Sequence, residues 1–182
     1  MSYENFLESK LYAAGAEGIT DPVVDAAWLF PFQRTITQWA LRRGRAAVFA
    51  DTGLGKTRMQ LEYARQVRVH TGADVLILTP LAVAKQTVDE GARVGVEVHR
   101  ARSQEDVQPG ITVANYDRLH LFDPGAFAGV VLDESSILKA VDGKTRTDLI
   151  ESFRGTPFRL ACTSTPSPND FTELVNHAEF LG

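Results

Sequence analysis

The sequence has little cysteine, no long apolar run and no excess of positive charge, and each absence excludes a class of protein. Its one cysteine, Cys162, lies in an apolar run, so we expect a buried thiol in a reducing compartment rather than an internal disulfide. No apolar segment approaches the roughly 20 residues that span a bilayer, and the first residues lack the basic and apolar regions of a signal peptide. We therefore expect a soluble, cytoplasmic protein.

Charge and histidine content point away from two further classes. With 19 Lys and Arg residues against 23 Asp and Glu residues, the formal net charge is −4, so any nucleic-acid binding must depend on a local patch. The histidines are dispersed and do not have the spacing of a zinc or iron site, so we expect each one at the surface or in a loop. They are His70, His99, His120 and His177.

The 182 residues are 44% hydrophobic, which is enough for one domain with a sizeable core. Short apolar runs alternate with helical segments, and the runs are continuous, which is typical of strands buried on both faces of a parallel sheet. The runs occupy residues 46–50, 75–79, 111–115, 129–133 and 158–163, with a weaker one near 95–98. The pattern predicts an α/β fold with a doubly wound, mainly parallel sheet flanked by helices.

The first 30 residues carry no strand signal and are predicted to form a short helical N-terminal cap, separate from the α/β domain over residues 31–182. One amphipathic helix is predicted near the start of the cap. A second is predicted over residues 23–30, because an Asp-Pro pair precedes this segment and Pro31 follows it. A third helix is predicted over residues 33–43.

A glycine-rich segment follows the first apolar run and precedes the first crossover helix, which is the context of a phosphate-binding loop. The segment is Ala50-Asp51-Thr52-Gly53-Leu54-Gly55-Lys56-Thr57. The two glycines allow the backbone N–H groups to surround a phosphate, and the helix N-terminus adds partial positive charge. Lys56 would bind the β- and γ-phosphates, and the Thr57 hydroxyl would ligate Mg²⁺. The alternative is a glycine-rich turn that binds nothing, and Ala50 stands where the general motif has glycine.

An acidic pair, Asp133 and Glu134, ends another apolar run. We assign Asp133 to the metal and Glu134 to the attacking water, although acidic residues also commonly begin ordinary loops. Polar segments follow five of the predicted strands, at residues 51–57, 79–80, 115–116, 133–134 and 163–166. In a parallel sheet, all five would lie along one edge, where α/β proteins bind ligands.

Together these segments resemble the first RecA-like lobe of a superfamily 2 helicase or translocase, nearest to the Swi/Snf-like branch that also occurs in phage and prophage proteins. The resemblance covers about residues 30–182, and residues 50–57 match motif I including its alanine. It implies a P-loop domain that uses ATP and Mg²⁺, acts on DNA, and works in a bacterial cell or a phage-infected host cell.

The resemblance also implies roles for individual residues. The catalytic residues would be Lys56, Asp133 and Glu134, with Thr57 and Asp133 at the metal. Phe32 and Gln33 resemble the adenine-recognising Q motif, so the nucleotide would contact Phe32, Gln33, Thr52, Gly53, Leu54, Gly55, Lys56 and Thr57. Nucleic acid would contact Pro80, Leu81, Gln86, Asn115, Tyr116 and Lys139. The segment Thr163-Ser164-Thr165-Pro166 resembles motif III, which couples the two sites.

Two features depart from that family. Ser136 stands where DEAD and DEAH boxes have Asp or His, which predicts loss of the usual contact between motifs II and III. Motifs IV to VI belong to a second lobe that these residues do not contain, and the arginine fingers there contribute about 10³- to 10⁵-fold in rate. We therefore expect this chain to bind nucleotide but to hydrolyse it poorly unless a second lobe pairs with it.

Two alternatives start from the same loop. A small P-loop kinase would need an acceptor pocket and a basic lid, and no arginine-rich lid follows the predicted sheet. A non-hydrolysing module that uses nucleotide as a switch would need the loop but not Glu134.

Overall fold

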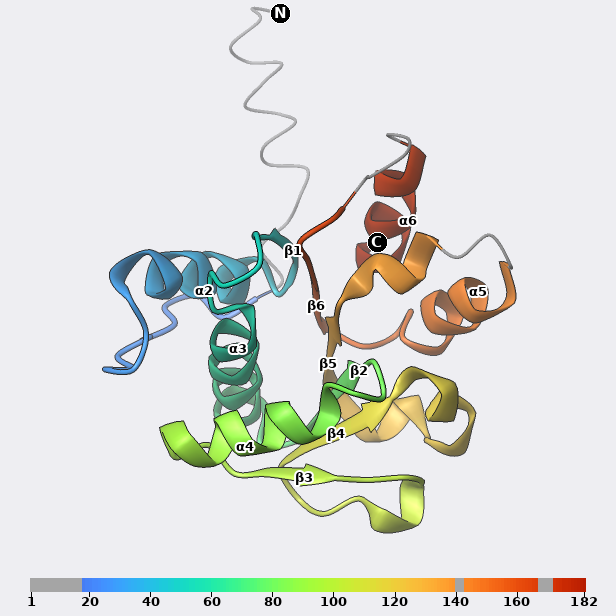
Figure 1. The fold of residues 1–182 in the computed structure, drawn as a ribbon, viewed down its shortest axis with the longest axis horizontal. Coiled ribbons are helices and arrows are strands. Elements are labelled where there is room, and N and C mark those ends of the chain that lie inside the picture. The colour runs from blue at the N-terminus through green and yellow to red at the C-terminus, as the bar shows by residue number, and fades with distance from the viewer. Residues whose placement is uncertain (1–17, 140–142, 167–171) are drawn as a thin grey trace, which may run out of the picture.

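One six-stranded sheet organises the computed structural model, which describes residues 18–139, 143–166 and 172–182 (Figure 1). All the strand pairs are parallel, and the strand order is β1-β6-β5-β2-β4-β3. The strands are β1 Arg45–Phe49, β2 Asp74–Thr79, β3 Val98–Arg100, β4 Ile111–Asn115, β5 Phe127–Asp133 and β6 Phe158–Thr163. Each strong apolar run of the sequence forms a strand, which confirms the predicted parallel α/β sheet.

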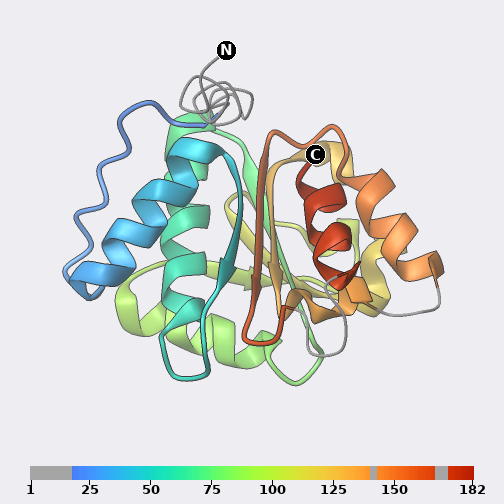
Figure 2. The ribbon, with the colours of Figure 1, turned by 90° about the horizontal axis from the view of Figure 1, so that it is seen from above.

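Helices cover both faces of the sheet (Figures 1 and 2). The α-helices are α2 Pro31–Arg43, α3 Lys56–Thr71, α4 Ala84–Val94, α5 Gly143–Ser152 and α6 Thr172–Leu181. Short 3₁₀ helices are η1 Gln104–Asp106, η2 Tyr116–Leu121, η3 Pro124–Ala126 and η4 Ser135–Lys139. None of the described helices combines the length and the apolar character that a membrane-spanning segment needs.

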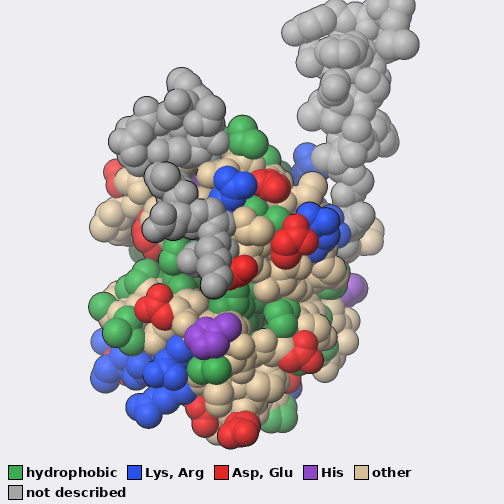
Figure 3. All heavy atoms as spheres, turned by 90° about the vertical axis from the view of Figure 1, so that its right-hand side faces the viewer, with side chains coloured by type: hydrophobic (Ala, Val, Ile, Leu, Met, Phe, Trp, Pro, Cys, Tyr) green, Lys and Arg blue, Asp and Glu red, His purple; other side chains and the backbone are tan. Residues whose placement is uncertain are grey.

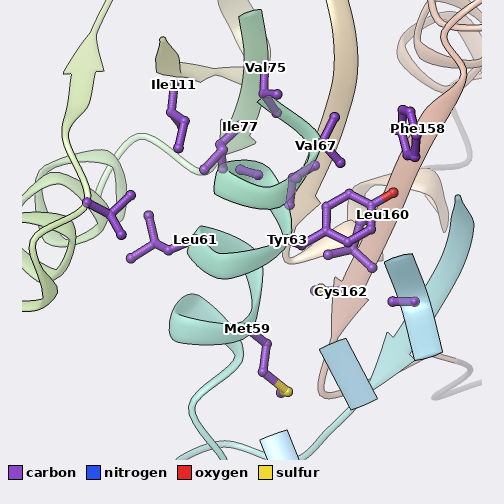
Figure 4. Packing of buried hydrophobic residues seen from close by; sticks show 14 of the residues in the cluster. Met59, Leu61, Tyr63, Val67, Val75, Ile77, Ile111, Phe158, Leu160 and Cys162 are labelled. Atoms are coloured by element: carbon purple, nitrogen blue, oxygen red, sulfur yellow. The ribbon is translucent and has the colours of Figure 1, made fainter. Parts of the chain in front are cut away.

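Successive residues of the central strands enter two different cores, which explains why their apolar runs are continuous. Val75 and Ile77 of β2 pack in the cluster that α2, α3 and α4 cover, whereas Leu76 and Leu78 pack beneath α5 and α6. Figure 4 shows the first cluster around α3. Cys162 of β6 is fully buried in it, as predicted.

The helix predicted over residues 23–30 is wrong, because residues 18–30 contain no helix. The backbone carbonyls of Pro22 and Val23 instead accept side-chain hydrogen bonds of 3.0 and 2.7 Å from Gln residues of α2 and α3. These long-range contacts override the local start signal. Pro31 begins α2 at its first position rather than ending a helix, which suits its fixed φ. The helix predicted near the start of the chain lies outside the described residues.

Because all six strands run the same way, the segments that follow them lie along one edge of the sheet. Figure 2 shows the loops after β1 and β2 at this edge, at the bottom of the view. The five polar segments identified in the sequence follow β1, β2, β4, β5 and β6, so the fold brings them to the same edge, as predicted.

Candidate nucleotide-binding site

The loop between β1 and α3 wraps around the side chain of Lys56. The Lys56 ammonium group donates hydrogen bonds of 2.8 and 3.2 Å to the carbonyls of Ala50 and Asp51. Gly55 caps α3 with a φ of 77°, and Gly53 has a φ of 85°. Both values lie in the left-handed region that favours glycine. The first N–H groups of α3 have no partner within the helix, so the loop and helix end can hold an anion there.

Gln33 of α2 supports this loop from behind. Its side-chain Nε2 donates a 2.9 Å hydrogen bond to the Leu54 carbonyl, and its Oε1 accepts a 2.9 Å bond from the Phe30 N–H. Only 2% of Gln33 is exposed. A Cβ at Gly55 would lie 2.2 Å from Gln33 Nε2, so only glycine fits there. The first role of the Gln33 amide is therefore to position the loop, and its reading of adenine stays a prediction.

An exposed aromatic pair lies next to Gln33. Phe30 and Phe32 are 62% and 45% exposed, and their rings are nearly parallel, with centroids 6.3 Å apart and an interplanar angle of 7°. Phe32 was predicted to contact the nucleotide. Phe30 was not, because it was placed at the end of a helix that does not form. Apolar faces of this kind beside a phosphate-binding loop suit a flat base.

Asp133 ends β5 in a buried position, where it is 7% exposed. Burial raises the pKa of its carboxyl above the ordinary value of 3.8. A 2.7 Å hydrogen bond from Gln60 Nε2 of α3 opposes the rise in pKa, the charge of Glu134 adds to it, and Lys56 opposes it. A divalent cation at this position would favour the ionised carboxylate.

Glu134 has a φ of 54°, which is unusual for a residue other than glycine. Its Oε1 accepts a 2.6 Å hydrogen bond from the Thr163 hydroxyl, and the Thr163 oxygen in turn accepts a 3.1 Å bond from the Thr165 N–H. The segments after β5 and β6 are therefore in direct contact. The Ser136 hydroxyl instead donates a 3.4 Å hydrogen bond to the Glu134 carbonyl, and it is Glu134 that contacts the segment after β6.

A pocket of about 380 Å³ at the same edge adjoins the acidic pair. Its lining includes four of the predicted nucleic-acid contacts together with Glu134: Pro80, Leu81, Asn115 and Tyr116. Asn115 is 6% exposed, and its Oδ1 has no hydrogen-bond partner among the described residues, so a donor from a ligand could satisfy it.

Tyr116 is 5% exposed, and its hydroxyl donates a 2.8 Å hydrogen bond to the backbone carbonyl of Asp133. Burial, followed by the nearby charge of Asp133, raises the pKa of Tyr116 well above its ordinary value, so the hydroxyl remains a donor. Tyr116 thus connects the pocket wall to the end of β5.

The remaining predicted residues are distributed more widely. Gln86 is exposed on α4 and does not line the pocket, Lys139 ends η4 with a side chain outside the described part, and Ser164, Thr165 and Pro166 follow β6.

No protein-family model matches the chain, and a comparison with curated protein sequences found no match. Solved structures are similar to it. The SWI2/SNF2 ATPase core of Sulfolobus solfataricus in complex with dsDNA has a TM-score of 0.73 and 21% identity, over 89% of this chain and 37% of that chain. The UvsW helicase of bacteriophage T4 has a TM-score of 0.67 and 14% identity, over 100% and 66% of the two chains.

A hypothetical ATP-dependent RNA helicase from Sulfolobus tokodaii also matches, with a TM-score of 0.57 and 18% identity, over 76% of this chain and 46% of that chain. The chain therefore shares the parallel α/β fold of these solved structures. It spans between 37% and 66% of the length of these three solved chains.

Three residues of the candidate site were missed by the sequence analysis. Gln60 follows Lys56 by one helical turn, and this spacing could have placed it on the same side of α3. Ser135 and His177 form a buried contact of 3.0 Å between Oγ and Nε2. His177 is 2% exposed, so its predicted surface position is wrong. No local signal marks it, because its partner lies 42 residues earlier in the chain.

Proposed function

We propose that this chain is the ATP-binding lobe of a DNA-dependent ATPase of the helicase or translocase type, which hydrolyses ATP with Mg²⁺ when paired with a second lobe. The observation that carries the proposal is the hydrogen bond between Thr163 and Glu134. It joins Glu134 to the end of β6, and the Thr163 carbonyl in turn accepts a 3.2 Å hydrogen bond from the Ala50 N–H at the start of the predicted phosphate loop.

The nucleotide would bind along this edge in a defined order. Phe32 and Phe30 offer exposed ring faces to the base, and Lys56 would exchange its two loop carbonyls for phosphate oxygens. Thr57 and Asp133 would hold Mg²⁺, which neutralises charge that develops on the phosphates. Among the described residues, no group of three or more His, Cys, Asp and Glu side chains could hold a metal. The ion would therefore depend on the phosphates for further ligands.

Glu134 is placed to orient the attacking water. Its carboxylate is half-buried, lines the pocket, and keeps one oxygen in the hydrogen bond with Thr163. A ligand in the pocket that contacts Tyr116 would also act on the Asp133 carbonyl, which gives a physical route between the two sites.

Nucleic acid is the partner that the neighbouring surface favours. Arg100 ends β3, and the Arg118 guanidinium donates a 3.4 Å hydrogen bond to the Arg102 carbonyl. All three arginines are exposed, and none forms an ion pair with a carboxylate within residues 18–139, 143–166 and 172–182. Figure 3 shows Lys and Arg side chains gathered at the lower part of one face, the level at which β3 lies in Figure 1. Such a group suits a phosphate backbone.

DNA is favoured over RNA because one similar structure is described in complex with dsDNA. The test is binding of this chain, with and without Mg-ATP, to duplex DNA, single-stranded DNA and duplex RNA of equal length, followed by ATP turnover on each. We expect binding to DNA, weak turnover of the chain alone, and tighter DNA binding when nucleotide is bound. Equal or tighter binding to RNA would overturn the DNA assignment. Nucleotide binding without any nucleic-acid binding would favour the switch module.

A further inference from the structure

Three consecutive residues at the end of β5, Asp133, Glu134 and Ser135, are each held by a different element. The Asp133 carboxylate accepts a hydrogen bond from Gln60 of α3, and the Glu134 carboxylate accepts one from Thr163 at the end of β6. The third residue, Ser135, contacts His177 of α6 through its hydroxyl, at 3.0 Å from the ring Nε2. Ser135 is fully buried and His177 is 2% exposed, so solvent does not compete for this contact.

The His177 ring also touches the strand that leads into the phosphate loop. Its edge-to-face contact with Phe49 has a centroid separation of 5.4 Å and an interplanar angle of 86°. Phe49 is the last residue of β1, and the next residue, Ala50, begins the loop and donates a 3.2 Å hydrogen bond to the Thr163 carbonyl. One imidazole of α6 therefore contacts both segments that surround the predicted phosphate and metal positions.

The loop after β5 needs such support. Glu134 has a φ of 54°, and a residue other than glycine keeps this conformation only when its surroundings hold it. Ser135 is the next residue, and its hydrogen bond to α6 fixes the direction in which the chain leaves the strained position.

We propose that His177 is a positioning residue, which holds Ser135 so that Asp133 and Glu134 keep the geometry needed for Mg²⁺ and water. The inference rests on the proposed function. It also makes α6 part of the site: a shift of α6 against the sheet changes the placement of the metal-binding carboxylate. His177 touches neither nucleotide nor metal in this account and acts through its contacts with Ser135 and Phe49.

Four variants separate a hydrogen-bonding role from simple packing. Ser135→Ala removes only the hydroxyl. His177→Leu fills the space without a hydrogen-bonding group, whereas His177→Gln keeps a group that can donate or accept near the position of Nε2. Val175→Ala is the matched control, because Val175 lies on the same helix and its side chain is 61% exposed. Thermal unfolding establishes that each variant is folded.

The first measurement is the affinity of the chain for ADP with and without Mg²⁺. For Ser135→Ala and His177→Leu we expect unchanged affinity without Mg²⁺ and a gain from Mg²⁺ that is smaller by about fivefold, the size of one hydrogen bond. His177→Gln and Val175→Ala should keep the gain of the natural sequence. If Ser135→Ala and His177→Leu keep the full gain, or if His177→Gln loses as much of it as His177→Leu, the proposal is overturned.

The second measurement does not depend on nucleotide. Backbone hydrogen exchange without ligand should become faster at residues 133–136 and 50–55 in His177→Leu and Ser135→Ala, and should stay unchanged in His177→Gln. Uniform exchange rates across all the variants would contradict the positioning role. Failure of the proposed function has a separate signature, because then the natural sequence itself binds no ADP, or binds it equally well after Lys56→Ala.

Discussion

The Thr163 hydroxyl donates a 2.6 Å hydrogen bond to Oε1 of Glu134, although the two residues lie 29 positions apart in the chain. Thr163 is fully buried at the end of β6, and its oxygen also accepts the N–H of Thr165. The Glu134 carboxylate and the segment after β6 are therefore coupled by hydrogen bonds. A structural change at Glu134 would reach the segment after β6, and the reverse, through the Thr163 side chain.

Thr163→Val should destabilise the fold, because it keeps the shape of the side chain and removes a hydrogen bond to a charged group. We expect a loss of about 1.5 to 3 kcal/mol in the free energy of unfolding, measured by urea denaturation. Thr163→Ser keeps the hydroxyl and should lose less. Equal stability of Thr163→Val and the natural sequence would show that the bond to Glu134 contributes nothing.

Gln33→Ala should weaken nucleotide binding because it removes support from the phosphate loop, and not because it removes a contact with the base. Removing the amide frees the Leu54 carbonyl and disturbs the phosphate loop, so we expect about tenfold weaker binding of both ATP and inorganic tripolyphosphate. Gln38→Ala is the control, because Gln38 lies on the same helix and bonds to Pro22 instead. A loss confined to ATP would assign Gln33 to adenine and not to loop support.

Asp133→Asn should stabilise the chain at neutral pH in the absence of ligand. Burial raises the pKa of the Asp133 carboxyl in the folded state, so its contribution to stability is full below the unfolded value of 3.8 and is lost as pH rises through the folded pKa. The Asn side chain has no charge to bury and keeps an oxygen that can accept from Gln60.

The advantage of Asp133→Asn should therefore shrink as pH falls through the folded pKa toward 3.8. Urea unfolding between about pH 4 and pH 8 measures it. With saturating Mg-ADP, the natural sequence should become more stable than Asp133→Asn, because only the ionised carboxylate binds the metal well. An Asn variant that is less stable than the natural sequence at neutral pH without ligand would contradict this account of Asp133.

Arg102→Ala and Arg118→Ala should each weaken DNA binding and reduce its dependence on salt. Each lost phosphate contact lowers the slope of log K against log salt by about 1. Fluorescence anisotropy with a labelled duplex at several salt concentrations gives the slope. Arg93→Ala is the matched control, because Arg93 is exposed but already paired with Glu90 at 3.0 Å. Identical slopes for all three variants would exclude this arginine group from the DNA path.

The strands and the position of the glycine-rich loop between β1 and α3 could be predicted because both depend on local patterns. A strand buried on both faces needs a continuous apolar run, and residues 50–57 contain the glycines, lysine and threonine that phosphate binding needs. The strand order could not be predicted, because nothing in β1 shows that its neighbour is β6, more than 100 residues later.

The contacts that support the site were missed for the same reason. Gln33 reaches a carbonyl 21 residues away, and His177 contacts a serine 42 residues away, so only the assembled fold brings the partners together. The helix predicted over residues 23–30 is wrong for the opposite reason. Its local start signal is present, but contacts from α2 and α3 use the carbonyls of Pro22 and Val23. At these positions, long-range contacts outweighed the local preference for a helix.

The most direct test of the account is titration calorimetry of Mg-ATP binding to this chain and to Lys56→Ala, with Lys85→Ala as control. Lys85 is an exposed lysine of α4 whose ammonium group pairs with Asp89 at 2.6 Å. The account predicts binding to one site, weakened at least about tenfold by Lys56→Ala and unchanged by Lys85→Ala. Absence of binding to the natural sequence, or equal affinity in Lys56→Ala, would contradict it.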